Sequence, residues 1–325
     1  MRSGSGGASP PHSDLLVAPV QLYLPIAEMP VSVLYIIGIG AAIGFISGLL
    51  GVSGGFLLTP LLIFTGIPTA VAVGTSAAQV VASSSSGALA YWRRRSIDFR
   101  LAGVLVAGGA SGSAIGVTLF RLLDRNGQLE LIIALCYVVL LGSVGLLMLV
   151  ESGRTIVSRW RGRPLALGDN RARKWLRRLP WQVRFRVART QISILALLAL
   201  GLGIGLLGSF LGVGGGFLVI PALIYFFRIP TNVVLGTSLL QIVGTMAVAT
   251  VLHAVTNHSV DAVLALLLML GGIVGAQFGA RSALFLRGET LRALLAVLVL
   301  AVGARFLVDL VATPDDAYSI TEVRS

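Results

Sequence analysis

Long apolar stretches alternate with short polar or glycine-rich ones along the whole chain. A helix needs roughly 20 apolar residues to cross the ~30 Å hydrocarbon layer of a bilayer. Runs of that order recur at 31–50, 68–91, 101–120, 130–150, 191–211, 230–252, 262–280 and 291–311. Two further apolar stretches, 55–66 and 216–227, are too short to span a bilayer comfortably. The pattern predicts an all-α, polytopic integral membrane protein.

Composition supports this fold class and excludes several others. Of the 325 residues 56% are apolar and only 12% are charged, which is far from the composition of a soluble domain. The single cysteine, Cys136, lies in an apolar run, so it forms neither a disulfide framework nor a cysteine metal site, and we interpret it as a packing residue.

The formal net charge of +12 is concentrated where it favours a membrane surface. Arginine is abundant between Glu151 and Gln191, interleaved with Trp160, Trp175 and Trp181, and Trp92 precedes three consecutive arginines. Indole rings beside cations are typical of the bilayer interface, where the cations meet anionic headgroups. We therefore expect the basic linker to be cytoplasmic and to contact membrane lipids; a regulatory partner is the alternative, and no nucleic acid is expected.

The two halves of the chain carry matching motifs. GVSGGFLLTP at 51–60 returns as GVGGGFLVIP at 212–221, and GTS at 74–76 returns at 236–238. Gln79 then matches Gln241, and Asp98 matches Asp261. Glycines spaced four apart follow in both halves, a spacing that lets membrane helices approach closely. This indicates a gene duplication, with about four full helices and one short or re-entrant helix in each repeat.

The distribution of arginine favours an inverted orientation of the two repeats. The loop after the first GTS helix contains Arg93, whereas its counterpart TNHSVDA has no arginine and the following turn carries Arg281, Arg287 and Arg292. Because basic loops stay in the cytoplasm, the second repeat is expected to run opposite to the first, although a parallel arrangement fits the whole chain almost as well.

These boundaries divide the chain into five segments. We expect an N-terminal tail, a first membrane repeat, a basic cytoplasmic linker, a second membrane repeat and a C-terminal tail, at 1–30, 31–150, 151–190, 191–311 and 312–325.

The repeated glycine motif predicts a transport site. Glycine runs break a helix, and broken backbone at membrane depth persists only where it is buried in protein or lines a cavity. Two such breaks in corresponding positions are the sequence pattern of a transporter's binding site. The short helices that start at Gly55 and Gly216 would direct positive N-terminal ends into this site, which favours an anion. The hydroxyl and amide groups of the GTS helices are uncharged partners suited to oxyanions, although such groups also bond neighbouring helices.

Other chemistries lack their motifs. GIGLLG at 203–208 lies inside an apolar run with no preceding strand, so it is not a dinucleotide site, and no ATP-binding GxxxxGK[ST] loop is present. His253 and His258 have only Asp261 as a further metal ligand, so we interpret them as interfacial residues and expect neither metal nor cofactor. No acidic residue sits deep in an apolar run, so a buried proton relay is not expected.

With these motifs the chain resembles the sulfite exporter TauE/SafE family of bacterial membrane proteins over residues 35–310. The resemblance rests on GLLGVSGGFLLTPLL, GSFLGVGGGFLVIPALI, the two GTS elements with their glutamines and the glycine-spaced helices. It implies a multi-pass protein of the bacterial inner membrane that exports small sulfur-containing anions such as sulfite or organosulfonates without ATP. The substrate-binding residues it implies are Gly51, Gly54, Gly55, Thr75, Ser76, Gln79, Gly212, Gly215, Gly216, Thr237, Ser238 and Gln241.

Other hypotheses for the function stay open. Within transport, the alternative is a channel or importer for another small anion. A membrane enzyme would need a catalytic cluster that the sequence lacks, so we expect no enzymatic activity, and a scaffold that recruits partners through the basic linker is a third class. A homo-oligomer is compatible with the sequence.

Overall fold

The structure is a computed structural model, and it describes residues 21–50, 53–93, 95–160, 181–185, 187, 190–227, 229–282 and 288–311. Within these ranges the long helices coincide with the apolar runs: α1 (Val33–Leu50), α3 (Thr69–Arg93), α4 (Phe99–Arg125), α5 (Leu129–Trp160), α7 (Ile194–Leu211), α9 (Thr231–Leu252), α10 (Ala262–Ser282) and α11 (Gly288–Val311). The short apolar stretches form α2 (Gly55–Phe64) and α8 (Gly216–Pro221). One π-helical segment, η1 (Ala222–Phe226), continues α8, and another, η2 (His253–Asn257), continues α9.

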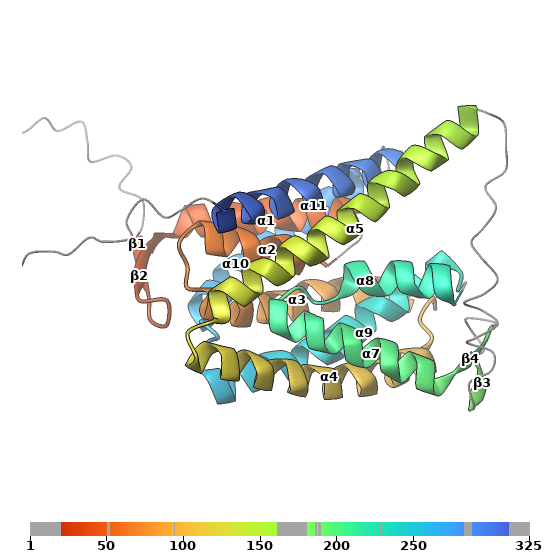
Figure 1. Ribbon diagram of the computed structural model, residues 1–325, viewed down its shortest axis with the longest axis horizontal. Coiled ribbons are helices and arrows are strands. Elements are labelled where there is room, and N and C mark those ends of the chain that lie inside the picture. Colours follow the sequence, from red (N-terminus) through yellow and green to blue (C-terminus); the bar gives the residue numbers. More distant parts are fainter. Residues whose placement is uncertain are drawn as a thin grey trace, which may run out of the picture.

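The helices form a bundle that is long and apolar enough for a bilayer. In the described part of the chain, 5 helical segments meet the length and hydropathy expected of membrane spans: 99–125, 129–146, 194–211, 233–257 and 262–279. Figure 1 shows the long helices lying side by side, with α5 and α11 on one side of the bundle and α4 and α7 on the other. The predicted all-α, polytopic membrane fold is confirmed.

Two short β-hairpins stand at opposite ends of this bundle (Figure 1). Strand β1 (Gln21–Leu24) pairs with β2 (Met29–Ser32), and β3 (Gln182–Phe185) pairs with β4 (Thr190–Ser193). Both hairpins fall in segments that the sequence assigns to a tail or a linker, and helix α5 also runs on to Trp160. The hairpins belong to the fold because each buries an apolar residue completely or nearly so, Leu24 in the first and Phe185 in the second.

Both halves of the chain contain the same order of elements: a hairpin, a long helix, a short helix and three long helices. The matched helices α3 and α9 run antiparallel, since Gly87 near the end of α3 contacts Leu239 near the start of α9, while Gly236 contacts Tyr91. An inverted pair of repeats requires this antiparallel course. The duplication itself stays a prediction from the sequence.

Glycine-spaced helices form the tightest seams of the bundle. Gly112 of α4 lies against the carbonyl oxygen of Leu202 in α7, and Gly275 of α10 lies against that of Ala41 in α1. A Cβ atom at either glycine would overlap the backbone of the facing helix. Close packing of small residues thus joins a helix of one half to a helix of the other, as the glycine spacing predicts.

Candidate functional site

The two glycine-rich breaks meet inside the bundle. Gly55, the first residue of α2, lies so close to the second break that an added Cβ would be 2.9 Å from the carbonyl oxygens of Gly212 and Val213. An added Cβ at Gly216 would in turn lie 3.2 Å from Cβ of Ser53. The rings of Phe56 and Phe217, which follow the two breaks, are 5.6 Å apart between centroids. The two breaks therefore lie next to each other in the structure.

The second break owes its shape to glycine. The φ angles of +70°, +75° and +67° at Gly212, Gly214 and Gly215 lie in the left-handed region, which residues other than glycine rarely adopt. The first turn of α8 begins directly afterwards, with the amides of Leu218 and Val219 donating to the carbonyl oxygen of Gly215. Helix α7 therefore ends at the break, and helix α8 begins only a few residues later.

Helices α3 and α9 cover the two breaks. Val80 of α3 touches both Gly55 and Gly214, and Ile242 of α9 touches Gly216. Both side chains are buried and belong to one small apolar cluster. Val80 follows Gln79 and Ile242 follows Gln241, so each glutamine lies one residue from a side chain that touches the breaks.

Several buried polar atoms in this region have no hydrogen-bond partner among the described residues. They are Oγ of Ser53, Oγ of Ser76, Oε1 of Gln79 and Oε1 of Gln241. Each of these residues is at most 4% exposed. A buried polar atom without a partner costs about 1–3 kcal/mol, so it calls for an explanation such as a bound ligand.

Each glutamine lies near a seam with the other half of the chain. The amide nitrogen of Gln79 lies against Gly272 of α10, the glycine that matches Gly109. Nε2 of Gln241 donates to Oγ1 of Thr245 in its own helix at 2.9 Å, and Thr245 in turn lies against Gly109 of α4. Gln79 thus contacts the other half directly, whereas Gln241 reaches it through Thr245.

The two GTS threonines have a structural partner. Oγ1 of Thr237 accepts a hydrogen bond from the backbone amide of Asp98, at 3.1 Å. Asp98 caps the start of α4, since its Oδ1 accepts from the amide of Leu101 and its Oδ2 accepts from the amide of Val187, which lies between β3 and β4. We call Asp98, Thr237 and Val187 the first clasp.

The second clasp has the same design at the other end of the bundle. Oγ1 of Thr75 accepts from the amide of Asp261 at 3.1 Å. Asp261 caps α10 through the amide of Leu264, and its Oδ2 accepts from the amide of Ile26 between β1 and β2. Thr75 and Thr237, which the family resemblance implies in substrate binding, therefore each hold an aspartate turn.

The other site residues predicted from the sequence differ in their contacts. The contacts between the breaks involve Gly55 with Gly212 and Gly216 with Ser53. Gly54 instead faces Ile43 of α1, Gly215 faces Ile204 of α7, and Gly51 lies outside the described residues. Ser238 donates to the carbonyl oxygen of Leu235 at 3.0 Å, so its hydroxyl is already engaged, unlike that of its counterpart Ser76.

Ser53 is a candidate that the sequence reasoning missed. Its hydroxyl is buried and adjoins Gly214 of the second break, while its Cβ adjoins Gly216. The signal was present in the sequence, because Ser53 is the position at which GVSGG differs from GVGGG.

His253 is a packing residue at the end of α9. Its Nε2 lies 3.0 Å from the carbonyl oxygen of Ser209, its Nδ1 lies 3.0 Å from Nδ2 of Asn257, and its ring packs edge-on against Phe120. His253 is fully buried and satisfied, so it does not lie at an exposed interface as expected. Among the described residues no group of three potential metal ligands was found.

Comparison with known proteins gives a consistent assignment. The family model described as Sulfite exporter TauE/SafE matches residues 36–306. A "Probable membrane transporter protein" of Xylella fastidiosa (strain 9a5c) is 34% identical over 256 residues, which cover 76% of this chain and 84% of the relative. "Probable membrane transporter protein YjnA" of Bacillus subtilis (strain 168) is 28% identical over 84% of this chain and 98% of its own length. No solved structure matches significantly.

Proposed function

Because the chain belongs to the sulfite exporter TauE/SafE family of membrane transporters, we propose that it exports a small sulfur-containing oxyanion, such as sulfite or an organosulfonate, without ATP. Its relatives are bacterial membrane transporters, and its helices suit a multi-pass bacterial membrane protein. The substrate passes between the two glycine-rich breaks. The direction of transport and the identity of the substrate are tested below.

The observation that carries the proposal is the set of unpartnered polar atoms beside the breaks. The hydroxyls of Ser53 and Ser76 are buried donors without an acceptor among the described residues. Hydroxyl groups donate well to sulfonate or sulfite oxygens. A bound oxyanion would supply the missing acceptors and remove the cost of burying these groups unpaired.

The amides of the short helix α2 add to this environment. Gly55 begins α2 and faces the second break, so the helix directs its N-terminal end toward the junction. The first backbone N–H groups of a helix lack intrahelical acceptors, and its N-terminus carries a partial positive charge. This arrangement stabilises an anion without a fixed cation, which allows the anion to leave again.

The charges of the described residues fit transport down an electrochemical gradient. The buried carboxylates are Asp98 and Asp261, and both are engaged as helix caps in the clasps. Neither is positioned among the orphaned hydroxyls as an obvious proton relay. An inside-negative potential favours anion exit by about 2.3 kcal/mol per charge per 100 mV, so export needs no further energy source.

The test is a flux assay with purified protein in liposomes. Sulfite, sulfate, an alkyl sulfonate and a carboxylate are offered in turn, with the membrane potential set by a potassium gradient. We expect sulfite or the sulfonate to move fastest, and to move faster when the side that carries substrate is made more negative. Preference for the carboxylate would instead support a transporter of another anion, and rates near those of open pores would support a channel.

A requirement for an imposed proton gradient would contradict the driving force proposed here. The sulfonate is the decisive substrate in that arm, because its charge does not change near neutral pH.

A further inference from the structure

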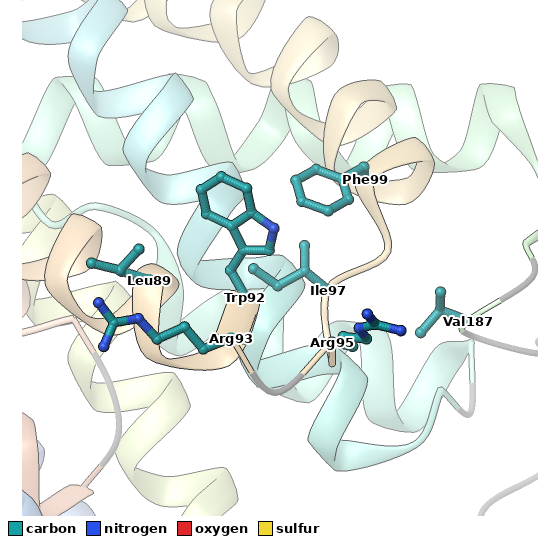
Figure 2. Close-up of a pocket in the computed structure, with 7 residues that line it drawn as sticks. All are labelled: Leu89, Trp92, Arg93, Arg95, Ile97, Phe99 and Val187. Carbon is teal, nitrogen blue, oxygen red and sulfur yellow. The ribbon is translucent and has the colours of Figure 1, made fainter.

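The turn between α3 and α4 forms a pocket that the transport site does not use. Its volume is about 590 Å³, and it is lined by Leu89, Trp92, Arg93, Arg95, Ile97, Phe99 and Val187. Figure 2 shows Trp92 and Phe99 facing each other above Ile97, with Arg95 and Val187 on one side. The pocket thus combines aromatic and aliphatic walls with two arginines at its rim.

The aromatic residues of this pocket are exposed. Trp92 and Phe99 are 59% and 56% exposed, and their rings meet edge to face with centroids 6.2 Å apart. Among the described residues neither Arg93 nor Arg95 forms an ion pair with a carboxylate. The pocket therefore offers apolar surface and uncompensated positive charge together, at the end of a helix in the membrane bundle.

The backbone at Arg95 gives a second, independent observation. Arg95 has a φ angle of +53°, a conformation in which glycine is preferred. The amide of Arg95 donates to the carbonyl oxygen of Trp92 and that of Ser96 donates to Tyr91, which is the hydrogen-bond pattern of a helix end that usually carries glycine at this position. A left-handed φ angle is uncommon for a residue other than glycine, so the position of Arg95 carries a conformational cost.

The matched turn in the other half makes the comparison direct. His258 occupies the position of Arg95 and also has a left-handed φ angle, +49°. The hydrogen bonds of the two turns differ, since Ser96 donates five residues back to Tyr91, whereas the amides of His258 and Ser259 both donate to His253 at the end of the π-helical segment η2. A left-handed residue therefore ends the helix in both halves, but the copy at the α3–α4 end combines it with arginines.

We propose that this pocket binds the headgroup of an anionic phospholipid from the surrounding bilayer. The phosphodiester lies at Arg95, Arg93 adds positive charge on the opposite side of Trp92 (Figure 2), and the glycerol and upper acyl chains pack on Trp92, Phe99 and Leu89. Arginine suits phosphate because its guanidinium offers several donors in a planar fork. Amphipathic aromatic rings favour the headgroup level of a membrane, which a free anion would not need.

The proposal is tested on the full chain purified in a neutral detergent. Thermal stability is measured while phosphatidylglycerol, phosphatidylcholine or soluble glycerol 3-phosphate is added. A ligand that binds the folded state raises the unfolding temperature. We expect phosphatidylglycerol to raise it clearly more than phosphatidylcholine does, and glycerol 3-phosphate to have no effect at the same concentration.

The key variant is Arg95→Gly, with His258→Gly as its matched control. Both substitutions place glycine where the backbone favours it, so both proteins are expected to be at least as stable as the parent without lipid. Arg95→Gly should weaken binding of phosphatidylglycerol by roughly tenfold or more, because a charge-assisted contact is lost, while His258→Gly should leave it unchanged. Arg95→Lys should retain part of the binding.

Three outcomes would overturn the proposal. One is an equal response to phosphatidylglycerol and phosphatidylcholine, and another is full lipid binding in Arg95→Gly. A response to glycerol 3-phosphate equal to that of the lipid would show a site for free anions instead.

Discussion

The two glycine-rich breaks are matched in sequence but differ in backbone conformation. Gly215 has a φ angle of +67°, whereas its counterpart Gly54 has a φ angle of −69° and serves as an ordinary right-handed cap of α2. Gly214 is left-handed as well, and its counterpart is Ser53, which is not. The second break therefore requires glycine for its shape, while the first supplies a hydroxyl at the same position.

The two clasps show the opposite behaviour. Asp98 with Thr237 and Asp261 with Thr75 make corresponding hydrogen bonds, each at 3.1 Å between the amide and the threonine oxygen. The two clasps are thus nearly symmetric, whereas the breaks that lie between them are not.

The largest effect is expected from a side chain at the junction itself. Gly55→Val should abolish flux, because its Cβ alone would meet the carbonyl oxygens of Gly212 and Val213 at 2.9 Å and would also overlap Val80. Flux in liposomes is the measurement, with membrane insertion checked separately. Gly203→Val is the control, since nothing lies within 4 Å of a Cβ at that position of α7. Near-normal flux in Gly55→Val would remove the junction from the mechanism.

The clasps should respond equally to equivalent changes. Asp98→Ala and Asp261→Ala each leave buried backbone donors unpaired, so each should lower stability by about 2–4 kcal/mol. Thermal unfolding in detergent measures this loss. The variants Thr237→Val and Thr75→Val test the same contacts from the other partner, because they remove the hydroxyl that accepts from the aspartate amide. A large loss for one aspartate and none for the other would show that the two ends are not equivalent.

The breaks, by contrast, should respond unequally. Gly215→Ala forces a side chain into the left-handed region and against Ile204, so we expect a loss of about 1–2 kcal/mol in stability. Gly54→Ala keeps a favourable φ angle, and its Cβ would lie 3.0 Å from Cγ2 of Ile43, so the loss should be well below that of Gly215→Ala. Equal losses would contradict the conformational difference between the breaks.

The smallest effect is expected from the serine that distinguishes the motifs. Ser53→Gly should fold normally and weaken substrate affinity several-fold, because one buried donor is removed while the backbone stays relaxed. The maximal rate should change less than the affinity. If Ser53→Ala and Ser53→Gly both transport with unchanged affinity, Ser53 is a packing residue and the first break contributes only its backbone.

Much of this architecture follows from patterns that are local in the chain. Apolar run length predicts α4, α7 and α10 because a bilayer span has a fixed thickness, and the glycine spacing predicts their seams because only small residues allow such contact. The two breaks are visible because glycines that are adjacent, rather than four apart, favour a break over a helix seam.

The features that the sequence did not predict depend on contacts between distant segments. The hairpins look like a tail and a linker, since their place in the fold is set by Asp261 and Asp98 on the opposite half. The same contacts explain why Thr75 and Thr237 resemble substrate ligands in the sequence: a polar residue in a membrane helix carries no local sign of whether it faces an ion or another helix. The orphaned hydroxyl of Ser53 could be identified only once the second break was seen beside it.

The central claim is that both breaks form one substrate site, and equilibrium binding tests it most directly. Titration of an alkyl sulfonate against the parent protein, Gln79→Ala and Gln241→Ala measures affinity and stoichiometry together. We expect one ion per chain in all three proteins, with a lower affinity in both variants, because each glutamine has a buried side chain with an unpartnered Oε1 on a helix that covers the junction. Two ions per chain in the parent, with either variant losing one and keeping the other at full affinity, would contradict a shared site.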